Sequence, residues 1–216
     1  MAASVKSQAT RRAQKALATR RRILDAAEVL FVRDGYAATT IVAIAGQADV
    51  AVQTVYAVFG TKRAVLSELL ASRVTGDHDT TPLKDRDDWR AMEAETDPRR
   101  QLRLLAAIAT QIGERMGALY NVLAGAAGSD PEIADMHRFQ QQHRHSDQRR
   151  VARSLARMGA LRPGLSEAHA TDIMWAVANP AMHRSLVAER QWAPGEYERW
   201  LAHVLTCSLL ETEDAL

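Results

Sequence analysis

A short segment around residue 53 carries side chains that could read the edges of DNA bases. Gln53 can pair with adenine, and a small apolar side chain such as Val52 can contact the methyl group of thymine. Hydroxyl, guanidinium and ammonium groups suit phosphate oxygens. The candidate DNA-contacting residues are Thr39, Thr40, Ala51, Val52, Gln53, Thr54, Tyr56, Lys62, Arg20 and Arg21. On residue type alone, Gln53 could equally be a solvated residue of a helix surface.

Apolar spacing predicts the helices that must hold these side chains. From Thr19 onward, apolar residues recur at intervals of three and four, and Gly35 is suited to end the helix they form. Further helices are predicted over residues 41–48, 51–58 and 62–73, the first of them capped by Thr39 or Thr40. The apolar residues of the leading helix are Ile23, Ala26, Ala27, Leu30 and Phe31.

The turn at Asp49-Val50 separates the second and third predicted helices. Beyond it, Val50, Val55 and Phe59 should face a core, which leaves the positions between them facing outward. Three short helices, the last two joined by a tight turn, describe a helix-turn-helix. The third helix would span about 12 Å, a length that fits the DNA major groove.

Charge is divided unequally along the chain. Residues 1–65 carry ten Lys/Arg and four acidic residues, whereas residues 66–216 carry 18 basic and 22 acidic residues. A basic N-terminal part indicates contact with a polyanion, although a solvated basic tail would give the same count. The arm over residues 1–18 either reaches phosphates or the minor groove or is a disordered tail. Its basic residues, with those that follow, are Arg11, Arg12, Lys15, Arg20, Arg21 and Arg22.

The rest of the chain is predicted to be all helical. A polar linker is expected over residues 75–88, followed by a long helix that is bent at Gly113 or Gly117. Another helix begins at Pro131 and stops at Gly159, and Pro180 should interrupt the next one. The last helix is predicted over residues 196–210. The resulting fold class is all-α, with an arm over 1–18, a three-helix domain over 19–65 and a helical domain over 66–216.

Several classes of function are excluded by what the sequence lacks. The one cysteine, Cys207, rules out an intramolecular disulfide framework and is expected to be a buried packing residue. No apolar run reaches the roughly 18 residues of a membrane span, and no signal peptide is evident, so a cytoplasmic location is expected. His137, His143 and His145 do not share a helix face, so no metal site is predicted. Without a catalytic motif or a phosphate loop, neither an enzyme nor a cofactor is expected.

The stretch from Arg20 to Leu66 resembles the DNA-binding domain of the TetR family. The family landmarks are Ile23-Leu24-Asp25-Ala26-Ala27, Leu30-Phe31, Gly35-Tyr36, Thr39-Thr40, Ile44-Ala45, Ala48-Asp49-Val50, Thr54-Val55-Tyr56, Phe59 and Lys62. The resemblance implies a homodimeric transcription factor, usually a repressor, that leaves a pseudo-palindromic operator in double-stranded DNA when a small molecule binds. It also implies that the helical remainder binds the ligand and forms the dimer.

Three positions depart from the family pattern. Asp49 stands where the family commonly has glycine, so it should adopt the left-handed backbone conformation. Ala51 replaces the usual Ser or Thr cap of the third helix, and Asp49 is a candidate to supply that cap instead. The segment from Tyr56 to Phe59 lacks the basic residue often found there. These departures affect the strength of DNA binding and remove no base-reading group.

The resemblance places the effector among the middle helices of the second domain. An aromatic and methionine lining would suit a hydrophobic or aromatic effector, although core packing is the alternative for each residue. Effector binding is expected to move the fourth helix, which links the two domains, and so change the separation of the recognition helices. The candidate ligand-binding residues are Met116, Tyr120, Met136, Phe139, His143, Met174 and Trp175.

Apolar residues on more than one side of the segments over 171–187 and 196–210 predict a four-helix dimer interface. No membrane partner is expected. The alternatives left open are an activator or an effector-independent regulator of the same fold. From another class, an all-helical small-molecule-binding protein or enzyme would have to be considered.

Overall fold

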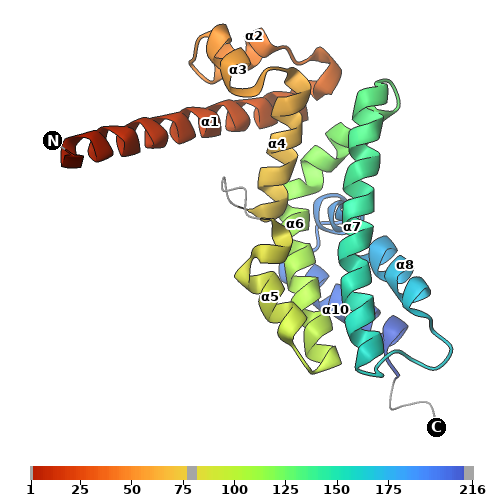
Figure 1. The fold of residues 1–216 in the computed structure, drawn as a ribbon. Coiled ribbons are helices and arrows are strands. Elements are labelled where there is room, and N and C mark those ends of the chain that lie inside the picture. The colour runs from red at the N-terminus through yellow and green to blue at the C-terminus, as the bar shows by residue number, and fades with distance from the viewer. Residues whose placement is uncertain (1, 77–81, 212–216) are drawn as a thin grey trace. The chain divides into compact units, whose positions relative to one another are not determined.

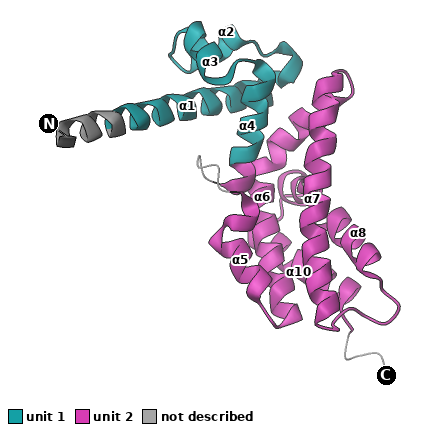
Figure 2. Cartoon of the chain, viewed as in Figure 1, with its two compact units in different colours: residues 1–72 teal, residues 73–216 magenta. Residues whose placement is uncertain are grey.

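A computed structural model describes residues 2–76 and 82–211 of the chain (Figure 1). Apart from one isolated bridge between Leu161 and Leu210, the regular structure of these residues is helical, which confirms the all-α prediction. The contacts divide the chain into two compact units, residues 1–72 and residues 73–216 (Figure 2). The first unit therefore ends at Ser72, whereas the sequence placed the boundary at residue 65.

The first unit consists of α1 (Ala2–Ala38), α2 (Ile41–Gln47), α3 (Val52–Phe59) and the greater part of α4 (Lys62–Thr75). Helix α1 begins at Ala2 and not at Thr19, so the predicted arm is an extension of the helix. The chain leaves helical geometry at Gly35, where φ is 80°, as its sequence position predicted. The fully buried core of this unit consists of Ile23, Ala27, Phe31, Ile44, Val55, Val65, Leu66, Leu69 and Leu70.

Backbone hydrogen bonds set the turn between α2 and α3. Asp49 has a φ of 50°, which confirms that it takes the left-handed conformation. The Val50 N–H donates to the carbonyl of Ala45 (3.0 Å), and the Asp49 N–H donates to that of Gly46 (3.2 Å). This pattern ends α2 as a Schellman motif does. Ala51 precedes α3 without any side-chain cap, so the prediction that Asp49 caps α3 is wrong.

The second unit contains the 3-10 turn η1 (Leu83–Asp85), α5 (Asp87–Ala94), α6 (Pro98–Ala127), α7 (Pro131–Arg157) and α8 (Glu167–Val177). It continues through α9 (Pro180–His183), the π-helical turn η2 (Arg184–Glu189) and α10 (Pro194–Leu209). The linker predicted over 75–88 is only partly a linker, because η1 and the start of α5 lie within it. Residues 77–81 of that linker fall outside the described residues.

Side-chain caps fix where several of these helices begin. Asp97 accepts hydrogen bonds from the N–H groups of Arg99 (2.8 Å) and Arg100 (3.2 Å) at the start of α6. Asp130 caps α7, Ser166 caps α8 and Asn179 caps α9 in the same manner. Each oxygen satisfies N–H groups that have no partner within the helix. Pro180 starts a new helix after α8, as predicted, and α6 runs through Gly113 and Gly117 without a break.

Cys207 is exposed on α10, so the prediction that it is buried is wrong for this chain. The core face of α10 carries Leu201, Leu205 and Leu209, which recur every four residues, and Cys207 lies between those positions. Among residues 2–76 and 82–211, no single helix is long and apolar enough to cross a membrane. The bent pair α2–α3 passes that test by length and composition only.

Candidate functional site

The outer face of α3 has the exposure expected of a DNA-reading surface. Val55 is completely buried, whereas Gln53 is exposed and the Tyr56 side chain has 54% of its surface accessible. Ala51 is exposed at the start of the helix, and Val52 and Thr54 are half-buried. Both residues of the proposed base-reading and phosphate-binding pair, Gln53 and Tyr56, therefore face outward. Their contact with DNA stays a prediction.

The two adjacent threonines before α2 have different environments. The hydroxyl of Thr40 accepts a hydrogen bond from the Ala43 N–H (3.1 Å), and the residue is exposed. Thr40 is therefore the cap that the sequence assigned to either threonine. Thr39 is only 1% exposed, and its hydroxyl donates to the carbonyl of Gly35 (2.8 Å). The proposed DNA contact of Thr39 is corrected on this ground, because a buried side chain cannot reach a phosphate.

Lys62 also has a structural role. Its ammonium donates to the carbonyls of Tyr36 (2.7 Å), Thr39 (2.8 Å) and, more weakly, Ala37 (3.3 Å). The same nitrogen lies 4.3 Å from the centroid of the Tyr36 ring. These carbonyls belong to the segment that joins α1 to α2, where the helix leaves them without intrahelical partners. Lys62 therefore caps that segment, and its proposed phosphate contact stays a prediction.

Of the two candidate arginines of α1, Arg20 is engaged within the fold and Arg21 is exposed. Arg20 forms a two-pronged ion pair with Glu68 of α4, and its guanidinium lies 4.9 Å from the centroid of the Phe59 ring. It joins three helices of the first unit and is not a free phosphate ligand. Arg21 is exposed, as are Arg11, Arg12 and Lys15 further up α1. These basic residues therefore lie on the surface of a helix, and their contact with phosphates or the minor groove stays a prediction.

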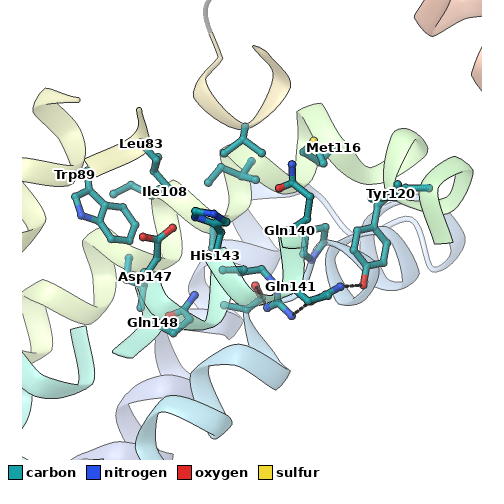
Figure 3. Close-up of a pocket in the computed structure, with 18 residues that line it drawn as sticks. Leu83, Trp89, Ile108, Met116, Tyr120, Gln140, Gln141, His143, Asp147 and Gln148 are labelled. Carbon is teal, nitrogen blue, oxygen red and sulfur yellow. Dashed lines mark hydrogen bonds between the residues drawn. The ribbon is translucent and has the colours of Figure 1, made fainter. Parts of the chain in front are cut away.

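A cavity with a volume of about 130 Å³ lies in the second unit (Figure 3). This is close to the size that accommodates a benzene ring. Helix α6 contributes an almost entirely apolar wall, and α7 contributes the polar side chains. The apolar lining includes Leu83, Trp89, Leu105, Ile108, Ile112 and Met116, and the polar lining consists of Tyr120, Gln140, Gln141, His143, Arg144, Asp147 and Gln148.

The cavity gathers only some of the ligand-binding residues proposed from the sequence. Met116, Tyr120 and His143 line it. Met174 is fully buried in the core, which favours the alternative of core packing for that residue. Phe139 is 57% exposed and lies against the ring of His143.

Two further residues of the proposed set also lie outside the cavity lining. Trp175 borders a shallow hollow between α7 and α8, together with Asp172 and Arg149. Met136 is half-buried and is absent from the lining. The sequence reasoning missed Trp89, Gln141, Arg144, Asp147 and Gln148. The recurrence of polar residues at 140, 141, 144, 147 and 148, one face of α7, was a signal that could have found most of them.

A hydrogen-bond network occupies one end of the cavity. The Gln141 amide donates to the Tyr120 hydroxyl (2.7 Å) and accepts from Nη2 of Arg144 (3.0 Å). Nη1 of Arg144 donates to the carbonyls of Trp175 and Ala178 at the end of α8, and its guanidinium lies 4.7 Å from the Trp175 ring. Burial lowers the pKa of Arg144 to about 10, so this arginine remains cationic at neutral pH.

The other end of the cavity has polar groups without partners. Figure 3 shows Asp147 and Gln148 beside Trp89 there. Burial raises the pKa of Asp147, because desolvation disfavours the ionised carboxylate. Within residues 2–76 and 82–211, Trp89 Nε1 and Gln148 Oε1 are buried without a hydrogen-bond partner, as is Nε of Arg144 at the first end of the cavity. Such atoms are costly unless a ligand or water satisfies them.

The sequence model of the bacterial regulatory proteins of the tetR family matches residues 23–69 of this chain. This match confirms the resemblance predicted from the sequence and covers α2, α3 and the adjoining parts of α1 and α4. No curated protein sequence matches the chain significantly.

Several solved structures share the fold over most of the chain. The transcriptional regulator FadR from Bacillus subtilis, in complex with stearoyl-CoA, is 16% identical with a TM-score of 0.69, over 87% of this chain and 98% of that one. NalD, the secondary repressor of an efflux pump in Pseudomonas aeruginosa, is 19% identical with a TM-score of 0.65, over 89% and 97%. SmeT, the repressor of a Stenotrophomonas maltophilia efflux pump, was solved with triclosan; it is 20% identical with a TM-score of 0.65, over 91% and 93%.

Proposed function

We propose that this chain, whose residues 23–69 carry a DNA-binding domain of the TetR family, is a ligand-responsive transcriptional regulator that reads DNA through α3. The observation that carries the proposal is the outward face of α3, where Gln53 and Tyr56 are exposed beside the buried anchor Val55. Gln53 can read a base edge in the major groove, and the Tyr56 hydroxyl can bind a phosphate. The exposed basic residues of α1 add a charge that favours DNA.

A repressor released by an effector is the mode of action that we favour. The structures of NalD and SmeT are those of repressors, and FadR and SmeT were solved with small molecules bound. In this chain, the cavity between α6 and α7 offers space for a small hydrophobic or aromatic effector. An activator, or a regulator without an effector, would use the same fold.

Helix α4 is the route by which an occupied cavity would act on DNA binding. It is continuous from Lys62 in the first unit to Thr75 in the second. Within the second unit, Val74 lines the cavity, and Arg115 of α6 donates to the carbonyls of Arg73 (2.8 Å) and Val74 (3.3 Å). A ligand that displaces α6 or Val74 would therefore shift the end of α4. A coupling of a few kcal/mol would suffice to release the operator.

We also propose that the regulator is a homodimer formed through α8 and α10. Leu201 and Leu205 are fully buried within the chain, whereas Val177 and Trp200 remain partly exposed. Ile173 of α8 is likewise only partly buried. A second copy would cover these apolar side chains and place two recognition helices on one operator.

Substitution of Gln53 by alanine tests the base-reading role. We expect the affinity for a selected operator to fall roughly tenfold, because one paired contact with a base edge is lost. Affinity for random duplex DNA should stay within about twofold, since phosphate contacts are unchanged. Fluorescence anisotropy with both duplexes measures the ratio of operator affinity to random-DNA affinity. The matched control is Gln142→Ala, at an exposed position of α7. An equal loss on both duplexes would contradict base reading by Gln53.

A further inference from the structure

We propose that the effector is a small organic ammonium ion with a ring-sized apolar body, and that Asp147 receives its charge. The inference rests on the proposed function, because it specifies which ligand the cavity takes. The carboxylate would pair with the ammonium group at the Trp89 end of the cavity, while the body of the ligand would lie against the apolar wall of α6.

Asp147 is the acidic group of the cavity lining, and Arg150, His143 and Lys84 stabilise its carboxylate only through charge, without a direct contact. It is half-buried, and it makes no hydrogen bond or ion pair within the described part of the chain. The nearby Arg150 is held by Glu93 through two contacts, of 2.7 and 3.0 Å. Lys84, also nearby, lies exposed on η1 and does not pair with Asp147. Partial burial of a carboxylate without a direct partner carries a desolvation cost, and a ligand cation would offset that cost.

Two neighbours of Asp147, Gln148 and Trp89, also favour a cationic ligand. Gln148 is only 6% exposed, and no described residue donates to its Oε1, so a second acceptor is available to an ammonium N–H. Trp89 is only 2% exposed and lies beside Asp147 in Figure 3. Its indole ring offers an apolar surface that attracts cations. Its Nε1–H can donate to an oxygen atom on the same ligand, where the ligand has one.

Arg144 is the permanently charged cation of the cavity lining and would oppose a cationic ligand, but its charge is already engaged. Its two terminal nitrogens donate to the carbonyls of Trp175 and Ala178 and to the side chain of Gln141. The two carbonyls lie at the C-terminal end of α8, where the helix dipole stabilises positive charge. Among the described residues, Nε of Arg144 has no hydrogen-bond partner. The rival ligand is therefore an anion that accepts from this Nε and from Trp89.

Three probes with the same ring separate these possibilities: benzylamine, benzyl alcohol and benzoate. Each is titrated into the full-length wild-type protein at pH 7.5 by isothermal calorimetry, and tryptophan fluorescence provides a second readout because Trp89 lines the cavity. We expect benzylamine to bind at least tenfold more tightly than benzyl alcohol, and benzoate to bind the most weakly.

Substitutions at Asp147 test whether its carboxylate causes the preference for benzylamine over benzyl alcohol. Asp147→Asn should lower the affinity for benzylamine at least tenfold and change that for benzyl alcohol less than twofold. Asp147→Glu keeps the charge and should keep the preference, so the test does not depend on a single variant. The matched control is Asp135→Asn, the same change at an exposed position of α7, which should alter neither affinity.

Tighter binding of benzoate than of benzylamine would overturn the proposal in favour of Arg144. It would also be overturned if none of the probes binds, or if Asp147→Asn keeps the full preference for the amine. Binding of the wild-type protein to selected duplex DNA is measured separately, without any probe. Specific DNA binding without amine preference overturns this inference alone, whereas amine preference without specific DNA binding overturns the proposed regulator.

Discussion

Replacing Lys62 with methionine is expected to lower the free energy of unfolding of the N-terminal unit by about 2–3 kcal/mol. The single ammonium group donates to three backbone carbonyls, those of Tyr36, Ala37 and Thr39. A hydrogen bond from a charged donor contributes roughly 1.5–3 kcal/mol, and removing the donor leaves the carbonyls without their partner. Methionine retains the apolar stem of the side chain, so the loss reports the charged group. Urea denaturation monitored by circular dichroism measures the effect.

The control for this substitution is Lys15→Met, at an exposed position of α1. We expect it to leave stability within about 0.5 kcal/mol of the wild-type value. If Lys62 instead binds a phosphate, its loss would leave the free energy of unfolding unchanged. The slope of the logarithm of the DNA-binding constant against the logarithm of the salt concentration would then fall in magnitude by about one. That outcome would contradict the capping role.

Replacing Gly113 with alanine is expected to destabilise the C-terminal unit by about 2 kcal/mol. A Cβ atom at this position would lie 2.4 Å from Cγ of His183 and 2.7 Å from its Cβ. His183 is only 5% exposed and packs against the ring of Tyr197, with the ring centroids 4.8 Å apart, so it has little room to move. Overpacking of this kind costs roughly 1–3 kcal/mol, which exceeds the helix-propensity gain of alanine. Thermal denaturation provides the measurement.

Gly125 on the same helix supplies the matched control for Gly113→Ala. A Cβ atom there meets nothing within 4 Å, so Gly125→Ala should stabilise the helix by about 0.5–1 kcal/mol. The double variant Gly113→Ala/His183→Ala should recover part of the loss, because the smaller side chain removes the overlap. Equal stabilisation by both glycine substitutions would show that α6 and His183 are not in close contact.

The secondary structure of the first unit was predictable because local patterns encode it. Apolar spacing located α2, α3 and α4, and the buried Val55 fixed which face of α3 points outward. The roles of Thr39 and Lys62 were not predictable from their residue types. Thr39 donates to the carbonyl of Gly35, and Lys62, at the start of α4, donates to carbonyls of the segment between α1 and α2, which lies more than twenty residues earlier in the chain. A polar side chain in a DNA-binding motif can stabilise the fold of the motif as well as contact DNA.

The cavity was less predictable than the fold. Methionine and aromatic residues suggested a ligand site, yet Met174 entered the core and Phe139 faces outward. The sequence predicted that these residues lie on helices of the second unit. Which face of each helix meets the cavity depends on how α6 packs against α7, and local spacing does not encode that packing. Trp89 follows a segment predicted to be a linker, and its place in the cavity follows from its burial in the core of the second unit.

Selection of bound sequences from random duplex DNA tests the central proposal most directly. The selected site would then be titrated at two salt concentrations. The proposed regulator predicts a pseudo-palindromic site whose half-sites lie about one DNA turn apart. That site should be bound at least about 10³-fold more tightly than random duplex DNA. Weak binding that is independent of sequence and is abolished by salt would contradict a DNA-reading role for α3.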